Sequence, residues 1–200
     1  MLRVVLVRHS MTGGNKLKRY IGITDEPLCD EGRELLAGRE YPDVEALYVS
    51  PMKRCMETAG IIYPGLSGEV IPGFREIDFG DFENKNYKEL SDNPDYQKWI
   101  DSGGKLGFPN GEPQEEFEKR ALQGFDEVTG KALASGYEKI ALVIHGGTIM
   151  TIMNHLAPTD NYYEYMVKNG GGYIVDFDVK EGKLEGILQI TPLFPENKEK

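Results

Sequence analysis

The stretch Arg-Val-Val-Leu-Val-Arg-His-Ser, residues 3–10, decides the fold class of this chain. Its apolar and β-branched residues 4–7 are typical of a strand that is buried on both faces. The strand signal ends abruptly at Arg8 and His9, and residues 11–15 favour a turn that leads into a helix. Ligands of open α/β sheets bind beyond the carboxyl ends of the strands. A guanidinium beside an imidazole suits the capture of an anion there, above all a phosphate, although the pair alone fits an ordinary strand end equally well.

Composition and charge are those of a single-domain globular protein, and we expect one domain over residues 1–200. The chain is 40% hydrophobic and 28% charged. Its formal net charge of −10 argues against a nucleic-acid or anionic-membrane surface. No signal peptide or membrane span is visible. Cys29 and Cys55 match neither a disulfide framework nor a zinc site, so we expect a cytoplasmic protein, while the oligomeric state stays open.

Strand signals alternate with helix signals along the chain, which is the pattern of a wound α/β sheet. We therefore expect an α/β fold, a three-layer αβα sandwich with a mostly parallel central sheet and helices on both faces. The further strands are expected near residues 46–49, 69–72, 139–144, 172–179 and 184–191.

Helix signals place four helices between these strands. Asp30 is the expected N-cap of a short helix, and Ser50-Pro51 supplies an N-cap and a first-turn proline to the next one. The clearest helix covers residues 114–135, where Glu116 and Arg120 are spaced to pair on the exposed face. A further helix is expected after the strand that follows it.

Residues 82–113 have weak periodicity and many turn residues, so we expect an excursion from the sheet and not a separate domain. Its aromatic residues either form a pocket wall that selects the substrate or anchor the excursion on the core, and the sequence favours neither. Residues 195–200 are expected to form a disordered tail. The four aromatic residues are Tyr87, Tyr96, Trp99 and Phe108.

Three of the expected strands end in residues that suit anion binding. The first strand delivers Arg8 and His9, the second is followed by Arg54, and the strand at 139–144 is followed by His145. Arg54 falls in the first turn of its helix, where a cation opposes the macrodipole. That position is understandable if the helix end and the guanidinium share an anion, and the alternative is an exposed surface arginine. Chance explains one such strand end far more easily than three.

A dense set of carboxylates follows the third strand, at residues 74–83. A carboxyl group in partly apolar surroundings has a raised pKa and can act as a general acid near neutral pH. Glu76 is the candidate for that role, and Asp78 is its nearest rival. Asp81 and Glu83 are expected to be solvated.

Six segments in this order resemble the motifs of one known family. Each alone is weakly to moderately specific, but together they resemble the histidine phosphatase superfamily, in its phosphoglycerate-mutase-like branch, over nearly the whole chain. Two of the loops are most similar to those of α-ribazole-phosphate and broad-specificity phosphatases. The six segments are residues 8–15, 20–32, 50–59, 74–80, 111–112 and 145–147.

The resemblance implies a phosphoglycerate-mutase-like fold and the hydrolysis of a phosphomonoester. His9 would be the nucleophile that forms a phosphohistidine. Glu76 would protonate the leaving alkoxide and then deprotonate the attacking water. The ligand would be a small phosphorylated metabolite, and neither a metal nor another cofactor is implied. The phosphate and substrate would be held by Arg8, Asn15, Thr24, Arg54, His145 and Gly146.

The chain departs from the family pattern at two positions. The family usually has glycine where this chain has Ser10, and glycine there permits a tight turn close to the phosphate. Serine needs ordinary backbone angles, although its hydroxyl can add a hydrogen bond. Cys55 stands where a small apolar residue is usual, and we expect a buried, inert thiol.

Other classes fit the sequence less well. A thiol phosphatase needs arginine six positions after its cysteine, but Leu35 and Ile61 stand there. A metallohydrolase needs more ligands than His9, His145 and His155, the last of which we expect to be structural. Two alternatives stay open: a phosphoglycerate mutase, which usually has a longer insertion before the long helix, and a non-catalytic module that binds a phosphate ligand.

Overall fold

The structure, a computed structural model, describes residues 1–104 and 106–195. Its centre is a six-stranded sheet in the order β3-β2-β4-β1-β5-β6. The pairs β3–β2, β2–β4 and β4–β1 are parallel, while β5 runs antiparallel to both β1 and β6. The strands are β1 (Leu2–Arg8), β2 (Ala46–Val49), β3 (Gly68–Val70), β4 (Lys139–Ile144), β5 (Gly172–Lys180) and β6 (Lys183–Leu193).

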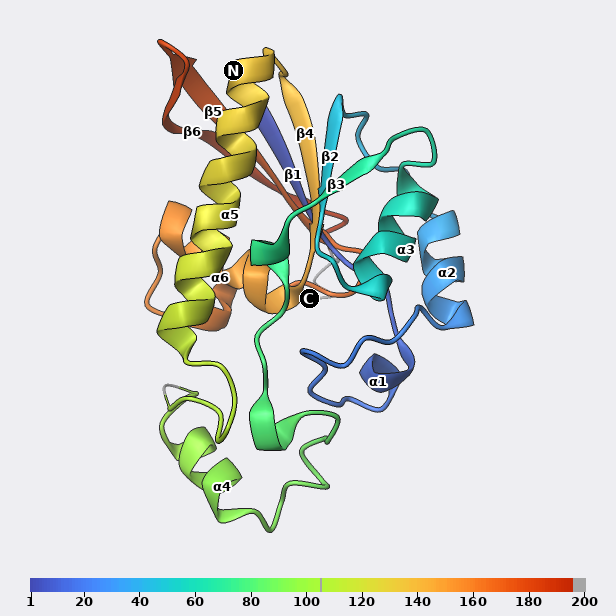
Figure 1. Ribbon diagram of the computed structural model, residues 1–200, viewed down its shortest axis with the longest axis vertical. Helices are drawn as coiled ribbons and strands as arrows, with labels where there is room; N and C mark the ends of the chain where they lie inside the picture. Colours follow the sequence, from blue (N-terminus) through green and yellow to red (C-terminus); the bar gives the residue numbers. More distant parts are fainter. Residues whose placement is uncertain (105, 196–200) are drawn as a thin grey trace, which may run out of the picture.

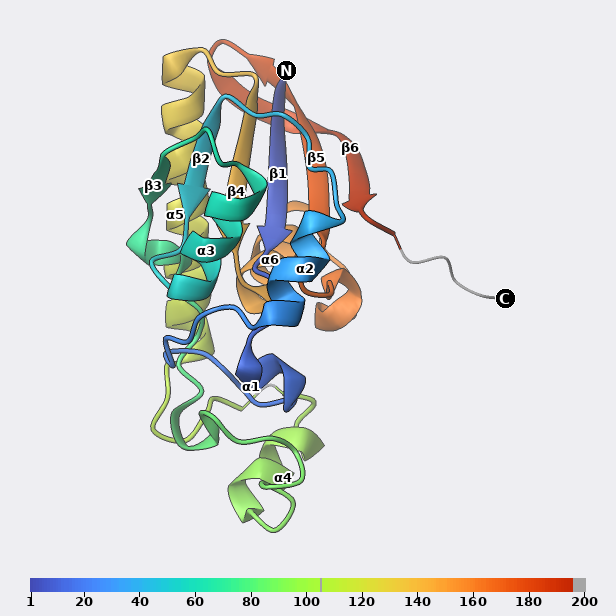
Figure 2. The same ribbon diagram turned by 90° about the vertical axis from the view of Figure 1, so that its right-hand side faces the viewer.

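Helices cover both faces of the sheet, so the predicted three-layer sandwich is confirmed (Figure 1). α2 (Asp30–Ala37) and α3 (Lys53–Ile62) lie on one face. α5 (Gln114–Ser135) and α6 (Gly146–Leu156) lie on the other (Figure 2). Within the described part of the chain, no helix is long and apolar enough to cross a membrane.

The apolar run in β1 forms a strand because both of its faces are buried. Val4 and Leu6 pack in the hydrophobic cluster under α5 and α6. Val5 and Val7 point to the opposite face and pack in the cluster under α3. A strand that alternates between two buried faces has no polar side, which explains the unbroken apolar run.

Two helices begin at other residues than the sequence predicts. Cys29, not Asp30, is the N-cap of α2, because its N–H donates to Met11 O at 3.0 Å and fixes the chain one residue earlier. α3 begins at Lys53, and the prediction of Ser50 as its cap is wrong. The Ser50 hydroxyl lies 2.7 Å from a ring nitrogen of His145 instead.

Most of the remaining elements, including α1 (Gly13–Lys16) and α4 (Pro94–Asp101), gather beyond the carboxyl end of β1, at the end of the molecule away from the N-terminus (Figure 1). They include most of the excursion predicted at 82–113. The prediction for the tail at 195–200 falls outside the described residues from 196 onward. The remaining elements are α1, α4 and the 3-10 turns η1 (Pro72–Phe74), η2 (Gly80–Phe82) and η3 (Tyr162–Tyr165).

The strand register brings three chain segments together at this end. Arg8 of β1 is paired with Ile144 of β4, and the next residue, His9, donates its N–H to Ile144 O at 2.9 Å. Ser50, directly after β2, donates its N–H to Val143 O at 3.0 Å. His9, His145 and Ser50 therefore lie side by side, each directly after the carboxyl end of one of three neighbouring strands.

Candidate active site

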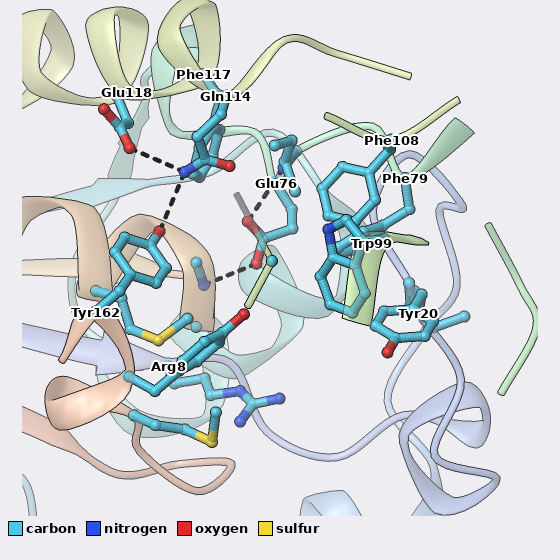
Figure 3. A pocket seen from close by; sticks show the side chains of 18 of the residues that line it. Arg8, Tyr20, Glu76, Phe79, Trp99, Phe108, Gln114, Phe117, Glu118 and Tyr162 are labelled. Atoms are coloured by element: carbon cyan, nitrogen blue, oxygen red, sulfur yellow. Dashed lines mark hydrogen bonds between the residues drawn. The ribbon is translucent and has the colours of Figure 1, made fainter. Parts of the chain in front are cut away.

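A cavity of about 660 Å³ lies beyond the carboxyl ends of β1 and β4 (Figure 3). Five of the predicted site residues line it, and three do not. The lining residues are Arg8, His9, Asn15, Glu76 and Gly146. The other three, Thr24, Arg54 and His145, contact one another or His9 beside the cavity.

The imidazole of His9 is held in one tautomer. Its Nδ1 lies 2.7 Å from Ser10 O, a carbonyl that only accepts, so Nδ1 carries the proton and Nε2 keeps a lone pair. The side chain is buried, and burial lowers the pKa of His9 well below its ordinary value, assisted by the cations of Arg54 and Arg8. The ring is therefore neutral and Nε2 is available as a nucleophile.

Ser10 shows how the chain makes the turn after β1 without the family's glycine. Its φ is not positive, so the backbone needs no left-handed residue here. Its hydroxyl donates to Gly32 O at 2.6 Å, and its N–H donates to Thr58 Oγ1 at 2.9 Å. Both the ordinary backbone angle and the added hydrogen bond agree with the prediction for this residue.

Arg8 presents an unused donor at the edge of the cavity. Its Nη1 donates to Val167 O at 2.6 Å. Its Nε is buried and has no hydrogen-bond partner among the described residues. A buried donor without a partner is unfavourable unless a ligand satisfies it, so Arg8 is suited to bind an anion.

Arg54 is completely buried, so the alternative of an exposed surface arginine is wrong. Its Nη1 and Nη2 donate at 2.8 Å to Thr24 O and Gly22 O, and its Nε donates to His145 Nδ1 at 3.3 Å. The contribution of Thr24 is thus its backbone carbonyl, which orients the guanidinium.

His145 is engaged at both ring nitrogens. Nδ1 accepts from Arg54, so the proton is on Nε2, which lies 2.7 Å from the Ser50 hydroxyl. Its ring centroid is 5.2 Å from that of His9. Burial lowers the pKa of His145 well below its ordinary value, followed by the effect of Arg54, so this second imidazole is neutral too.

Glu76 is the buried carboxyl of the cavity. Oε1 accepts from Ile77 N and Oε2 accepts from Gly147 N, both at 3.1 Å. Burial raises the pKa of Glu76, although these N–H donors and the two arginines oppose the shift. A carboxyl group with a raised pKa inside a cavity meets the requirement for a general acid. The rival residue, Asp78, caps Gly80 N at 2.8 Å and does not line the cavity.

The backbone of Glu76 is fixed by Arg120, and the predicted surface pair between Glu116 and Arg120 is wrong. Arg120 forms a two-point ion pair with Glu112, with both N–O distances 2.6 Å. It also donates to Glu76 O at 3.0 Å and to Gly73 O at 2.9 Å. Arg120 therefore joins α5 to the loop that carries the acid.

Glu83 is not a solvated carboxylate, which corrects the prediction for that residue. Its Oε1 accepts from Gly22 N at 2.8 Å and from Thr24 N at 2.9 Å. Gly22 must be glycine, because a Cβ there would lie 2.0 Å from Ile77 O. Glu83 thus fixes the loop whose carbonyls hold Arg54, while Asp81 is exposed as predicted.

Asn169 is a site residue that sequence reasoning missed. Its Nδ2 donates to His9 O and to Asn15 Oδ1, both at 3.1 Å. Asn15 Oδ1 also accepts from Thr12 N at 3.3 Å, so the NH2 half of Asn15 is the half left to contact a ligand. Arg39 holds the loop by donating to Asn169 O at 3.1 Å. No local motif announces Asn169, because its partners lie some 150 residues away in the chain.

Three of the four aromatic residues of the excursion take one or both of the predicted roles, and Tyr87 takes neither. Trp99 and Phe108 line the cavity. Tyr96 is buried in a small cluster at that end of the molecule, and Tyr87 is 51% exposed. Trp99 and Phe108 also pack against the same cluster, so they contribute to both the wall and the anchor.

Comparison with known proteins shows the family of this chain. The family model of the histidine phosphatase superfamily, branch 1, matches residues 4–189. The chain belongs to this superfamily. The resemblance drawn from the six sequence segments is thereby confirmed.

Individual relatives of this histidine phosphatase differ in their names. This chain is 30% identical to phosphoserine phosphatase 1 of Hydrogenobacter thermophilus, over 82% of this chain and 75% of that protein. It is 24% identical to the adenosylcobalamin/alpha-ribazole phosphatase of Escherichia coli strain K12, over 90% and 92%. The crystal structure of the alpha-ribazole phosphatase from Shigella flexneri aligns with a TM-score of 0.75 over 94% and 96%, and its 22% identity shows a shared fold.

The contact between Gly147 and Glu76 predicts a sensitive position in this histidine phosphatase. A Cβ on residue 147 would lie 2.5 Å from Glu76 Oε1, whereas one on residue 146 would lie 3.4 Å from Arg8 Nε. We expect Gly147→Ala to displace the acid and lower kcat for an alkyl phosphate by about 10²-fold, the effect of a misplacement near 1 Å. Gly146→Ala should lower this kcat much less. Steady-state kinetics of both variants test the prediction, and equal losses of kcat would contradict the contact between residue 147 and Glu76.

The bridge made by Asn169 predicts a second effect. Asn169→Ala should raise KM for a phosphate ester several-fold, the loss of a buried hydrogen bond, by letting Asn15 rotate. Asn169→Asp should be more damaging, because a carboxylate cannot donate to His9 O or Asn15 Oδ1 and brings negative charge toward the phosphate. Kinetics measured together with unfolding midpoints check this. If Asn169→Asp were no worse than Asn169→Ala, Asn169 would not orient the site.

Proposed function

We propose that this protein hydrolyses phosphomonoesters of small metabolites through a phosphohistidine on His9 Nε2, within a single catalytic domain. The observation that carries the proposal is the 2.7 Å contact between His9 Nδ1 and Ser10 O, which leaves Nε2 unprotonated in the cavity that also holds Glu76. Histidine can act as a nucleophile only from such a neutral ring.

In the first step the Nε2 lone pair of His9 forms a bond to phosphorus while the ester P–O bond breaks. The proton of Glu76 goes to the leaving alcohol oxygen. In the second step water attacks phosphorus, its proton goes to the Glu76 carboxylate, and the P–N bond breaks. Inorganic phosphate is released and the lone pair returns to Nε2.

Charge on the phosphoryl oxygens is stabilised by donors that line the cavity: the guanidinium of Arg8 and the amide of Asn15, with Gly146 at the start of α6. Arg54 and His145 do not line the cavity. We propose that the positive charge of Arg54 stabilises the phosphoryl oxygens through its electrostatic field. His145 orients Arg54 and packs against His9.

Relatives are named for α-ribazole phosphate and for phosphoserine, and of these two esters we propose α-ribazole 5′-phosphate as the candidate substrate. A phosphoglycerate mutase is the second candidate function. The fold itself does not separate the two, since a phosphoglycerate mutase from Thermus thermophilus aligns with a TM-score of 0.70. The third is a non-catalytic module, and the presence of a neutral nucleophile beside a buried acid argues against it.

Substitution of the nucleophile gives the primary test. His9→Ala should abolish phosphate release while the protein stays folded. The wild-type protein, quenched with alkali during turnover of a labelled ester, should carry an acid-labile label on His9. His155→Ala is the matched control, because His155 is exposed and lies outside the cavity, and it should keep full activity. Label on Cys55 or a serine would overturn the mechanism, and transfer of the phosphoryl group to a second phosphoglycerate would favour the mutase.

The acid role of Glu76 predicts a leaving-group and pH dependence. Glu76→Gln should slow an alkyl phosphate by ~10²–10⁴-fold and p-nitrophenyl phosphate far less, because p-nitrophenolate leaves without a proton. Glu76 must be protonated in the first step, so kcat/KM for the alkyl ester should fall as the pH rises through its raised pKa.

The Glu76→Gln variant should lack this basic limb. Asp78→Asn is the control and should keep it. If Asp78→Asn, and not Glu76→Gln, slowed the alkyl ester much more than p-nitrophenyl phosphate, Glu76 would not be the acid.

A further inference from the structure

The cavity extends well beyond what a phosphoryl group needs. Its volume of about 660 Å³ is typical of a site for a drug-sized ligand. Figure 3 shows two facing walls, with Glu76 and Arg8 between them. One wall consists of Tyr20, Phe79, Trp99 and Phe108, and the other of Phe117, Tyr162, Gln114 and Glu118.

The aromatic wall is held rigidly before any ligand binds. The ring centroids of Phe79 and Phe108 are 4.9 Å apart, and those of Trp99 and Phe108 are 5.5 Å apart. Tyr20 is fixed from behind by a 2.9 Å hydrogen bond between its hydroxyl and that of Tyr96. A preorganised aromatic surface binds a flat ring with little loss of side-chain entropy.

Both walls offer polar groups at their edges. The indole Nε1 of Trp99 is buried without a hydrogen-bond partner in the described part of the chain, and in Figure 3 it lies on the side of the ring toward Glu76. Opposite, Gln114 Nε2 donates to Glu118 Oε1 at 3.0 Å and to the Tyr162 hydroxyl at 3.4 Å. An unpaired buried N–H favours a ligand that brings an acceptor.

The charges of the outer cavity do not suit a second anionic group. The cations among its described lining residues are Arg8, at the phosphate end, and Arg19. Arg19 is paired through its Nη2 with Glu89 at 2.8 Å, while its buried Nε has no hydrogen-bond partner among the described residues. Glu118 and Asp160 add negative charge to the lining, so a substrate carboxylate here would be desolvated beside like charges.

The exposed residues that line the cavity are both apolar and polar, and Asp160 and Asn161 are the polar side chains among them. Tyr163 and Met166 line the cavity and are 39% and 58% exposed. The Tyr163 hydroxyl reaches across to the excursion, where a Cβ on Gly104 would lie 2.7 Å from it. Gly104 has a φ of +79°, so glycine suits this crossing for two reasons. Tyr163 and Met166 can therefore contact an apolar part of a ligand at the exposed side of the cavity.

We propose that the outer cavity is a binding subsite for a planar heteroaromatic ring, which stacks on the Trp99–Phe108 wall and offers an acceptor to Trp99 Nε1. The inference rests on the proposed function, since it names the class of ester hydrolysed there. That class is a monoester of a primary alcohol that carries an uncharged flat ring, as a nucleoside does. Esters whose alcohol carries a carboxylate are poor substrates.

The test compares esters that share one leaving group. Ribose 5-phosphate and adenosine 5′-phosphate both release a primary 5′-alcohol, and only the second carries a heteroaromatic ring. We expect kcat/KM for adenosine 5′-phosphate to exceed that for ribose 5-phosphate by at least about tenfold, the effect of one base stacking on an aromatic side chain. Phosphoserine and 3-phosphoglycerate should fall below ribose 5-phosphate.

Trp99 provides a readout that does not need catalysis, because it is the only tryptophan in the sequence. In a His9→Ala background, adenosine 5′-phosphate should quench its fluorescence in a saturable way, and ribose 5-phosphate should not. If no ester is hydrolysed but this quenching occurs, the proposed function fails and the subsite stands. If both esters are hydrolysed equally and neither quenches, the subsite is wrong and the proposed function stands.

Variants separate stacking from hydrogen bonding. Trp99→Leu should lower kcat/KM for adenosine 5′-phosphate at least about tenfold more than for ribose 5-phosphate. Trp99→Phe keeps a ring but loses the N–H, so its effect should be intermediate. Tyr87→Leu is the matched control, since Tyr87 belongs to the same excursion but is exposed and does not line the cavity. If the ratio of kcat/KM for adenosine 5′-phosphate to that for ribose 5-phosphate were the same in the wild-type protein and in Trp99→Leu, the proposal would be overturned.

Discussion

The site depends on one buried cation. Arg54 is fully shielded from water, and an uncompensated charge in that position would cost on the order of several kcal/mol. The carbonyls of Gly22 and Thr24 and the ring nitrogen of His145 compensate it, so the loop after α1, the start of α3 and the end of β4 are tied to one side chain. Glu83 holds that loop in turn, which makes the loop conformation a condition for burying the charge.

Burial shifts the pKa values of two titratable groups of the cavity in opposite directions. Burial and then the cations of Arg54 and Arg8 lower the pKa of His9, while burial raises the pKa of Glu76 against those cations. A neutral imidazole and a protonated carboxyl group can then coexist at one pH. These opposite shifts suit a nucleophile and an acid on different side chains of one pocket.

The parts of the fold and site that the sequence predicts are those with local signals. The apolar run of β1 and the residues that follow strands have a local pattern, and parallel register then brings His9 and His145 together. Arg120, Glu83 and Asn169 were missed or misjudged because their roles depend on distant partners. Arg120 reaches the backbone of Glu76 from α5, 44 residues away, and Asn169 reaches His9 from 160 residues away. Ser50 is similar: a sequence pattern cannot tell a helix cap from a partner of His145.

The central claim is that His9 is neutral with its proton on Nδ1, and ¹⁵N NMR of ring-labelled histidine tests it most directly. We expect the His9 Nε2 resonance to stay at the position of an unprotonated nitrogen, and the Nδ1 resonance at that of a protonated one, as the pH is lowered past the point where histidine in a short reference peptide is half-protonated. Protonation of both His9 nitrogens in step with the reference peptide, or a proton on Nε2 in the neutral ring, would contradict it.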